Sequence, residues 1–267
     1  NLCGTEHFVR SAVKEGKIEL SADCDGLLKV DSVRLKAVNS AGQVMIASRH
    51  GNTPVKKGDK ILGTRVIPLV IAEETLQKAE AAAGQAPLFR LMPYRLHRAA
   101  IAVTGSEVES GRIDDKFSPV VRDKLAEFGI ETVAVRQVGD DPARLTQAIL
   151  DFIAQGAEMV VCTGGMSVDP DDKTPLGIKN TGADIISYGA PVLPGAMFLL
   201  SYYGENRVPV CGLPGCVMYA KRTIFDLVLP RLAACDPVTA QDLAALGEGG
   251  LCLNCPVCTY PNCGFGK

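Results

Sequence analysis

Tryptophan is absent from the sequence, and aromatic residues make up only 5% of it. Single-stranded nucleic acids are bound largely by stacking bases on aromatic side chains, so this composition argues against such a surface. The formal net charge is -2 and the basic residues form no long run, which leaves nonspecific binding to DNA or to an anionic membrane without support. We therefore expect neither a nucleic acid nor a membrane as a partner.

Long hydrophobic runs are also lacking. The longest apolar stretch covers residues 66–72, contains Pro68 and is far too short to cross a bilayer. No signal-peptide pattern opens the chain as given. The expected location is the cytoplasm.

Cysteine is present but unevenly distributed. Four of the ten cysteines lie between Cys252 and Cys263, and the other six are scattered through apolar or loop segments. Disulfide-stapled domains are usually short and rich in cysteine throughout. A terminal group of thiols on a larger protein therefore favours a metal site over secretion.

The first part of the chain is rich in strand-forming residues. Residues 28–38 and 44–47 have partly alternating apolar side chains on either side of the turn-forming segment Asn39-Ser40-Ala41-Gly42. This arrangement predicts a β-hairpin, and a further apolar strand is expected over residues 60–70.

A helix and a proline-containing segment follow these strands. Residues 73–83 are helix-forming, and Gly84 is a natural stop for that helix. Residues 87–98 hold two prolines and several basic side chains, and we expect them to form a linker. The part before it, residues 1–86, is predicted to be a smaller β-rich domain with a terminal helix.

From Ala99 onward, predicted strands and helices alternate. The expected strands cover residues 99–103, 132–138 and 159–162. Strand and helix in this order imply right-handed crossovers and a parallel sheet. We therefore predict a three-layer α/β domain with a mostly parallel sheet over residues 99–235, whose ligand binds at the carboxyl ends of the strands.

Helix starts in this domain carry recognisable signals. Asp141 is a good N-cap and Pro142 suits the first helical position. A single long helix is expected after Leu213-Pro214-Gly215, with apolar residues from Val217 to Leu232 on its buried face. Residues 236–267 remain as a cysteine-rich tail.

Three glycine-containing corners follow predicted strands of this domain. They are Thr104-Gly105, Thr163-Gly164-Gly165 and Leu213-Pro214-Gly215. Backbone N–H groups at such corners and at helix starts can turn toward an anion. Any one of them is equally typical of a solvated turn, but three at one sheet edge predict an anion-binding pocket.

Acidic residues accompany two of these corners. Glu107 follows the first corner, and Asp169, Asp171 and Asp172 follow the second. Carboxylates beside a phosphate site suit Mg²⁺, which takes one or two protein oxygens together with phosphate oxygens. Arg112 and Lys173 flank the acidic motifs and could contact phosphate or molybdate, although a solvated surface position is the commoner role for each alone.

Taken together, these segments resemble the molybdopterin-binding domain of molybdenum-cofactor biosynthesis proteins. The matching motifs, in the order of that family, are Thr104-Gly-Ser-Glu107, Gly111-Arg-Ile-Asp-Asp115, Gly139-Asp-Asp141, Thr163-Gly-Gly-Met-Ser167 with Asp172, and Gly212-Leu-Pro-Gly215. The resemblance covers about half of the chain. It extends to gephyrin-type molybdopterin adenylyltransferases, to molybdotransferases and to the related competence-damage proteins.

The resemblance implies roles for individual residues. Thr163, Gly164 and Gly165 would hold a phosphate of molybdopterin or of its adenylate, and Asp172 would be the catalytic residue that serves Mg²⁺ and phosphate chemistry. The other residues that it assigns to the cofactor pocket are Thr104, Gly105, Glu107, Asp115, Ser167, Pro214, Gly215 and Cys216. The implied partners are the pterin or its molybdenum form, ATP, further copies of the chain and a molybdoenzyme.

The sequence departs from the family pattern at three places. Lys116-Phe117 stands where the family usually has a small hydroxyl residue and Asn, and Cys216-Val217 replaces Asn-Pro. Pro194-Gly195-Ala196-Met197 lacks the cation of the corresponding molybdotransferase motif. The function is therefore either a nucleotidyl or molybdate transfer to molybdopterin with Mg²⁺, or a non-catalytic carrier or sensor of the molybdenum cofactor. Nucleotide pyrophosphate hydrolysis, as in the competence-damage relatives, is a third alternative.

Cys216 and the three histidines require separate interpretations. At a helix start beside an anion corner, the pKa of the Cys216 thiol would fall and the thiolate would become a ligand or nucleophile. A buried, inert thiol is the commoner outcome for such a cysteine. His7, His50 and His97 show no spacing with carboxylates or cysteines that would make a metal site.

The tail has the spacing Cys252-x2-Cys255-x2-Cys258-x4-Cys263. Four soft ligands so close together match zinc or an iron–sulfur cluster. The run is one residue longer before its last cysteine than the ferredoxin pattern C-x2-C-x2-C-x3-C, and its three evenly spaced cysteines slightly favour iron–sulfur. The alternative is a flexible tail with spare thiols.

Overall fold

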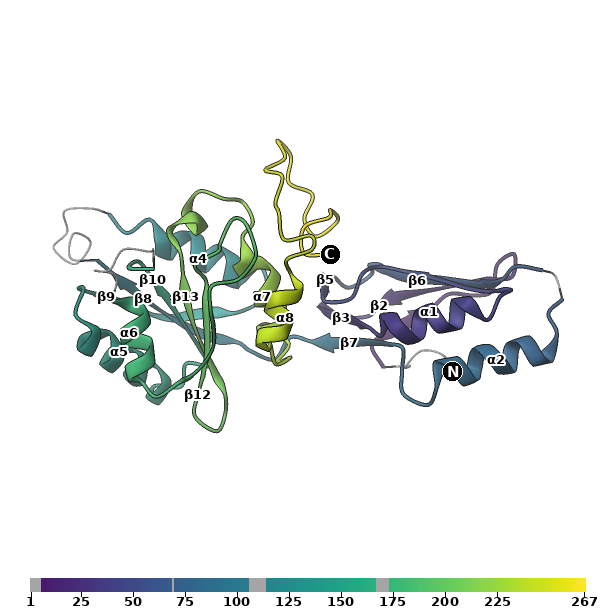
Figure 1. Cartoon of the computed structure of the whole chain (residues 1–267), viewed down its shortest axis with the longest axis horizontal. Coiled ribbons are helices and arrows are strands. Elements are labelled where there is room, and N and C mark those ends of the chain that lie inside the picture. The colour runs from purple at the N-terminus through teal and green to yellow at the C-terminus, as the bar shows by residue number, and fades with distance from the viewer. Residues whose placement is uncertain (1–5, 69, 106–113, 167–172) are drawn as a thin grey trace. The chain divides into compact units, whose positions relative to one another are not determined.

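The computed structural model describes residues 6–68, 70–105, 114–166 and 173–267. The chain forms two compact units, Asn1–Tyr94 and Arg95–Lys267, and each is described here by itself (Figure 1). In the described part of the chain, every helix is too short or too polar to span a lipid bilayer.

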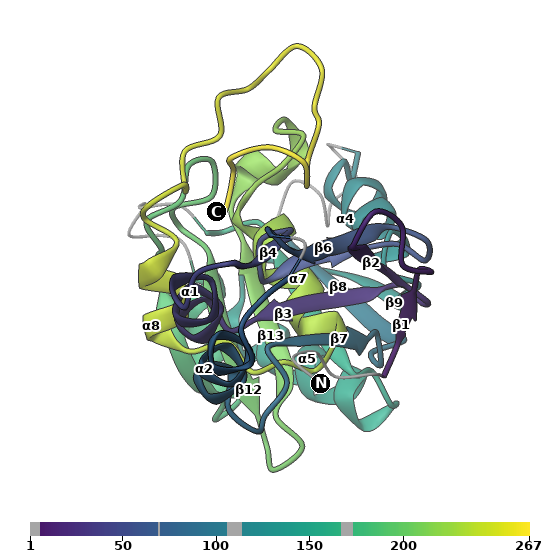
Figure 2. The same ribbon diagram turned by 90° about the vertical axis from the view of Figure 1, so that its right-hand side faces the viewer.

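The N-terminal unit combines two antiparallel sheets with two helices. Its four-stranded sheet has the order β1-β2-β6-β4 and its three-stranded sheet the order β5-β3-β7. The strands are β1 (Phe8–Arg10), β2 (Lys17–Ala22), β3 (Gly26–Val30), β4 (Val44–Ser48), β5 (Thr53–Val55), β6 (Lys60–Val66) and β7 (Phe89–Pro93). Helices α1 (Ser32–Ser40) and α2 (Glu73–Ala83) pack against each other (Figure 2). Their apolar sides join the sheets in one core that includes Val38, Ile46, Ile61 and Phe89.

The predicted hairpin over residues 28–47 is wrong, because the second half of its first strand is helix α1. The Asp31 carboxylate accepts a hydrogen bond from Arg34 N at 2.9 Å and another from Arg34 Nε at 2.8 Å. These contacts cap the helix start and outweigh the strand-like alternation of the segment. Val33, counted as part of the alternating pattern, is 81% exposed on the helix surface. Strand β4 pairs instead with β6, antiparallel, from Val44 opposite Val66 to Ser48 opposite Leu62.

The predicted linker over residues 87–98 contains the boundary between the two units, but its first part is not a linker. Phe89–Pro93 forms strand β7, which pairs with β3. Phe89 is fully buried and Leu91 is 5% exposed, so this segment belongs to the core of the N-terminal unit. The boundary between the two units lies between Tyr94 and Arg95. Two prolines and several basic residues indicated a linker. The alternating apolar residues of the segment instead form a strand of the three-stranded sheet.

The C-terminal unit is built on one six-stranded, mostly parallel sheet, as predicted. Its strand order is β11-β12-β13-β10-β8-β9. The strands are β8 (Arg98–Thr104), β9 (Glu131–Val138), β10 (Met159–Thr163), β11 (Asp184–Tyr188), β12 (Leu199–Tyr203) and β13 (Val208–Leu213). Strands β13, β10, β8 and β9 are parallel, whereas β12 pairs antiparallel with β13, and β11 pairs antiparallel with β12 at the edge of the sheet.

Helices cover both faces of this sheet and complete three layers (Figure 1). They are α4 (Phe117–Ala126), α5 (Pro142–Ala154), α6 (Thr174–Asn180), α7 (Ile224–Ala233) and α8 (Ala240–Ala245). On the face covered by α5, Ile149 and Phe152 pack with alternate strand residues such as Ala102 and Val160. Helix α5 begins as predicted: Asp141 caps it by accepting from Ala143 N, and Pro142 occupies the first turn.

The long helix predicted after Gly215 is divided into two. A short 3-10 helix, η1, covers Gly215–Met218, and α7 begins only at Ile224. Thr223 caps α7 through a reciprocal pair of hydrogen bonds with Asp226, in which each side chain accepts from the backbone of the other residue. This capping box starts a new helix and explains why the apolar periodicity does not continue from one segment into the next.

Candidate functional site

The three glycine corners converge at one edge of the sheet of the C-terminal unit. At the end of β10, Thr163 lies opposite Val103 of β8 and opposite Leu213 of β13. Because these strands are parallel, their carboxyl ends lie at the same edge of the sheet, and the corners that follow them begin there. The predicted convergence is therefore confirmed. Strand β9 ends at the same edge, with Val138 opposite Thr104.

This edge also contains a switch in strand order. Strand β9 lies on one side of β8, and β10 lies on its other side, so the two crossovers run in opposite directions. The carboxyl ends of β8 and β10 therefore lie at a topological switch point of the sheet. Ligands of doubly wound sheets bind at such points.

Three threonines connect the first two corners. Thr104 Oγ1 donates to the carbonyl oxygen of Thr163 at 3.1 Å and lies 3.1 Å from Thr174 Oγ1. Thr174 Oγ1 in turn lies 2.9 Å from the carbonyl oxygen of Gly164, to which it donates. The Thr104 and Thr174 hydroxyls thus hold the β8 and β10 corners together. Sequence analysis missed Thr174, whose only signal was its position immediately after Lys173.

Thr163 contributes an unsatisfied hydroxyl to this edge. Its side chain is fully buried, and Oγ1 has no hydrogen-bond partner among the residues that the structure describes. A buried hydroxyl without a partner costs roughly 1–3 kcal/mol, so such groups are normally paired with protein, water or ligand. Thr163 Oγ1 is therefore a buried polar atom at the second corner that the described residues leave unsatisfied.

The second corner accepts only glycine. Gly164 has φ +86°, and a Cβ there would lie 2.5 Å from the carbonyl oxygen of Thr104. Gly165 has φ +54°, and its Cβ would lie 2.8 Å from Thr174 Oγ1. Both residues thus combine a left-handed backbone with close packing, Gly164 against Thr104 of β8 and Gly165 against Thr174 at the start of α6. Lys173, Thr104 and Gly165 line a small cavity of about 20 Å³ here, beside the Gly139-Asp140-Asp141 turn.

Comparison with known proteins agrees with this geometry. Residues 100–234, slightly more than half of the 267-residue chain, match the family described as a probable molybdopterin binding domain. The chain belongs to the molybdopterin-binding domain family. The matched residues span the whole sheet and all three glycine corners.

Curated relatives of this family member are considerably longer. A molybdopterin molybdenumtransferase from Synechococcus elongatus is 25% identical over 205 residues, which are 73% of this chain and 48% of that protein. A CinA-like protein from Mycobacterium tuberculosis is 41% identical over 78 residues, which are 29% of this chain and 18% of that protein. The chain thus spans about half the length of the first relative and less than a fifth of the second.

Solved structures with similar arrangements include the tungsten cofactor synthesizing protein MoaB from Pyrococcus furiosus. Its match has a TM-score of 0.42 and 22% identity and covers 52% of this chain and 93% of that one. The molybdopterin biosynthesis enzyme MoaB from Thermus thermophilus matches with a TM-score of 0.41 and 19% identity, covering 51% and 92%.

The acidic residues of the molybdopterin-binding domain divide into two groups. Glu107 and Asp172, together with Ser167 and Arg112, lie outside the described residues. Asp115 is described, and its carboxylate accepts hydrogen bonds from Phe117 N at 2.9 Å and Ser118 N at 3.0 Å. Its contacts therefore fix the start of α4. In the described segments, no acidic group at this edge is arranged to hold a metal ion.

The third corner places Cys216 at the first turn of η1, close to the edge of the sheet. Pro214 precedes η1 and Gly215 begins it. The Cys216 thiol is partly buried, and this burial raises its pKa above the ordinary value. Of the two interpretations, the structure favours the inert thiol, because η1 is a single short turn and offers little helix dipole to stabilise a thiolate.

Alkylation kinetics should reveal this raised pKa. We expect the rate of Cys216 modification by iodoacetamide to keep rising above about pH 8.5, the pKa of a free cysteine. The modified peptide can be quantified by mass spectrometry across a pH series, with a cysteine-containing peptide as the reference. A rate that reaches its plateau below pH 7.5 would instead establish an activated thiolate.

One histidine has neighbours that its sequence spacing did not reveal. The register that pairs Phe8 of β1 with Ala22 of β2 brings His7 beside Asp23. His7 Nδ1 lies 3.8 Å from Asp23 Oδ1, and one potential ligand atom each of His7, Asp23 and Cys24 lie within 4.8 Å of one another. The sequence spacing, which showed no carboxylate or cysteine pattern for a metal site at any histidine, thus did not anticipate this group around His7. Strand pairing, which spacing along the chain does not encode, creates this group.

The four tail cysteines are all described and all carry free thiols. Cys252, Cys255, Cys258 and Cys263 line one cavity of about 550 Å³ on the C-terminal unit. The structure thus gathers the residues that the spacing singled out around a common space, while their role as metal ligands remains a prediction.

Proposed function

We propose that the C-terminal unit binds molybdopterin through its phosphate at the edge formed by β13, β10, β8 and β9. The observation that carries this proposal is the Thr163-Gly164-Gly165 corner at the switch in strand order, where a buried hydroxyl lacks a partner and no side chain fits at either glycine. A phosphate there would accept from Thr163 Oγ1 and from backbone N–H groups, as anions do at turns of this kind.

On this proposal the protein acts in molybdenum-cofactor biosynthesis as a transferase. Asp172 and Glu107 would hold Mg²⁺, which would neutralise phosphate charge while ATP or molybdate approaches the pterin. Gly105, Asp115, Ser167 and the third corner, Pro214 to Cys216, would complete the pocket. The chain's contribution is to position the reacting groups, and the product would pass to a molybdoenzyme partner. We extend the proposal to self-association of the chain.

A carrier that binds the cofactor without transforming it is the second candidate. It is favoured by Cys216, whose partly buried thiol is a weaker hydrogen-bond donor than the Asn amide that the family usually has there. Ala196 also provides no cation where molybdotransferases have one. Both features reduce the polar groups available to stabilise a transition state.

Incubation of the full chain with molybdopterin, Mg²⁺ and ATP discriminates between these candidates. A transferase should form the adenylate, and Asp172→Ala should lower that turnover by about 100-fold, as loss of one stabilising contact in the transition state does. The matched control is Asp184→Ala, a change to an exposed residue at the start of β11, which should leave turnover unaffected.

Each remaining outcome has a distinct meaning. Tight pterin binding without an adenylate supports the carrier, and hydrolysis of a nucleotide pyrophosphate bond supports the chemistry of the competence-damage relatives. Absence of pterin binding under saturating Mg²⁺ would contradict the proposal. Turnover in Asp172→Ala equal to that of the unmodified chain would remove Asp172 from the catalytic site.

A further inference from the structure

The tail of the C-terminal unit is held to the unit at both of its ends. At its beginning, Leu193 N donates to Gly250 O and Cys252 N donates to Leu193 O, each at 2.8 Å. At its end, Gly266 N donates to Gly249 O at 2.9 Å. The segment between these anchors projects as a loop from the unit (yellow in Figure 1). The tail is therefore a closed loop rather than a free end.

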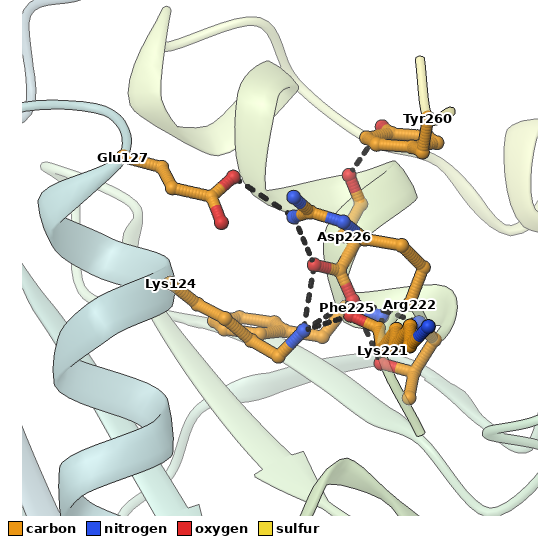
Figure 3. Close-up of polar contacts among 8 residues, drawn as sticks. Lys124, Glu127, Lys221, Arg222, Phe225, Asp226 and Tyr260 are labelled. Atoms are coloured by element: carbon orange, nitrogen blue, oxygen red, sulfur yellow. Dashed lines mark hydrogen bonds and ion pairs between the residues drawn. The ribbon is translucent and has the colours of Figure 1, made fainter. Parts of the chain in front are cut away.

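Aromatic packing strengthens the second anchor. Tyr260 Oη donates to the backbone carbonyl of Asp226 in α7 at 2.8 Å (Figure 3). Phe265 is 5% exposed and meets the Tyr260 ring edge-on, with 6.4 Å between the ring centroids. A Cβ on Gly266 would lie 2.5 Å from Leu227 Cδ2, so the end of the chain fits closely against α7. These contacts define where Cys258 and Cys263 can lie.

Between its anchors the loop has little regular secondary structure and little buried apolar surface. It contains neither helix nor strand after the bridge at Leu251. Leu253 is 78% exposed and Val257 is 75% exposed, so these apolar side chains of the loop do not form a core. Segments with so little buried apolar surface are commonly ordered by a bound metal centre, whose binding energy becomes folding energy.

The thiols face a shared cavity and are not arranged for a single ion. In a tetrahedral zinc site, Zn–S bonds of about 2.3 Å bring four sulfur atoms close together. Within the described ranges, no three of the tail cysteines form a group tight enough to hold one ion. All four nevertheless line the same cavity of about 550 Å³. An iron–sulfur cluster of the four-iron type takes one thiolate on each iron and so needs them farther apart.

The backbone of the loop permits this spacing. Cys252, Cys255 and Cys258 recur at intervals of three, as in cluster-binding runs. Asn254, between the first two, has φ +50°, a left-handed conformation that Asn tolerates better than most residues. The turn there redirects the chain between successive thiols.

Cations line the same cavity and complement the charge of a thiolate-ligated cluster. Arg222 and Lys221 both contribute to the wall of the cavity. Lys221 Nζ donates to the carbonyl oxygen of Pro256 at 2.8 Å, and the Arg222 guanidinium lies over the Tyr260 ring, 5.1 Å from its centroid. Arg222 is itself held by Glu127 and Asp226 at 2.8 and 2.9 Å (Figure 3). Two positive side chains are thus fixed beside the loop, where they would stabilise an anionic cluster.

We propose that Cys252, Cys255, Cys258 and Cys263 bind one [4Fe–4S] cluster in this cavity. Binding replaces the four thiol protons by bonds from sulfur to iron, and it requires no oxidation or reduction of the protein. No residue that lines this cavity is assigned to the proposed pterin pocket, so the two proposals can be tested independently.

The full chain, purified and reconstituted anaerobically with equal amounts of ferrous and ferric iron and with sulfide, provides the test. We expect about four iron and four sulfide per chain, with broad visible absorbance from thiolate-to-iron charge transfer. Cys258→Ser should lose most of this iron and absorbance. Cys258 is exposed, so the variant should keep its far-ultraviolet circular dichroism spectrum. Cys235→Ser, which changes another exposed free cysteine outside the cavity, should keep the full cluster.

Any of three results would overturn the proposal. One is stoichiometric zinc with no iron after reconstitution in the presence of both metals. Another is a chain that, after reconstitution, holds neither metal and in which all four tail thiols are alkylated freely. Equal iron content in Cys258→Ser and Cys235→Ser would likewise show that the tail does not ligate the cluster. Pterin binding, measured on the same samples, reports on the proposed function separately.

Discussion

Replacing Asp226 with alanine is expected to destabilise the C-terminal unit by about 4 kcal/mol, the range for breaking a buried ion pair from one side. Asp226 is 2% exposed and its carboxylate contacts Lys124 Nζ at 2.7 and 2.8 Å (Figure 3). It also accepts from Thr223 N at 2.7 Å and from Arg222 Nη1 at 2.9 Å. Alanine would leave the Lys124 ammonium, whose side chain is 7% exposed, without its charged partner.

Urea-induced unfolding of the full chain, followed by circular dichroism, measures this loss. The matched control is Asp242→Ala, because Asp242 forms the same capping box with Thr239 at the start of α8. Its side chain is 37% exposed, and the change should remove the cap and a 3.3 Å contact with Arg231, which keeps Asp236 as a charged partner, at a cost of about 1–2 kcal/mol. Similar losses in the two variants would mean that the buried pair contributes little beyond capping.

Changing Gly164 to alanine is expected to impair both folding and ligand binding. The new methyl group would lie 2.5 Å from Thr104 O and 2.8 Å from Thr104 Oγ1, at a backbone φ of +86°. We expect a loss of roughly 3 kcal/mol in unfolding free energy, the sum of left-handed strain and local overpacking. The displaced corner should also weaken molybdopterin binding at least tenfold, about 1.4 kcal/mol.

The control for this variant separates backbone strain from steric conflict. Gly182 has φ +82°, and a Cβ there would have no atom within 4 Å. Gly182→Ala should therefore lose only about 1–2 kcal/mol and leave pterin affinity unchanged. Calorimetric titration with molybdopterin and urea unfolding of both variants provide the two readouts. If Gly164→Ala retains full affinity at a temperature where it is folded, the corner does not hold the ligand.

Local signals in the sequence predicted the elements whose stability is mainly local. Glu73–Ala83 forms the expected helix, ending at Gly84 with φ +66°. Asp141 and Pro142 begin α5 as expected, and the short apolar strands of the C-terminal unit lie where their composition placed them. Capping, helix termination and buried-strand composition depend on neighbours within a few residues, so they can be read directly from the chain.

Local signals failed where two patterns competed. The segment beginning at Ser32 has strand-like alternation, but the Asp31 carboxylate caps it as a helix. Thr223 and Asp226 likewise divide one continuous apolar pattern into η1 and α7. In each case a side-chain hydrogen bond to the backbone decided the outcome. The residues that form it are visible in the sequence, although their competition with periodicity is resolved only in the folded unit.

The sequence by itself determined the α/β class of the C-terminal unit, its family and the edge at which the glycine corners meet. These follow from the order of strands and helices, because parallel strands joined by right-handed crossovers must present their carboxyl ends together. Only the tertiary structure decided which side chains of different helices, strands and loops contact one another. Thr104 contacts Thr174, Lys124 pairs with Asp226, and Tyr260 anchors the tail to α7. Such contacts join residues far apart in the chain, and their partners are selected by packing rather than by spacing.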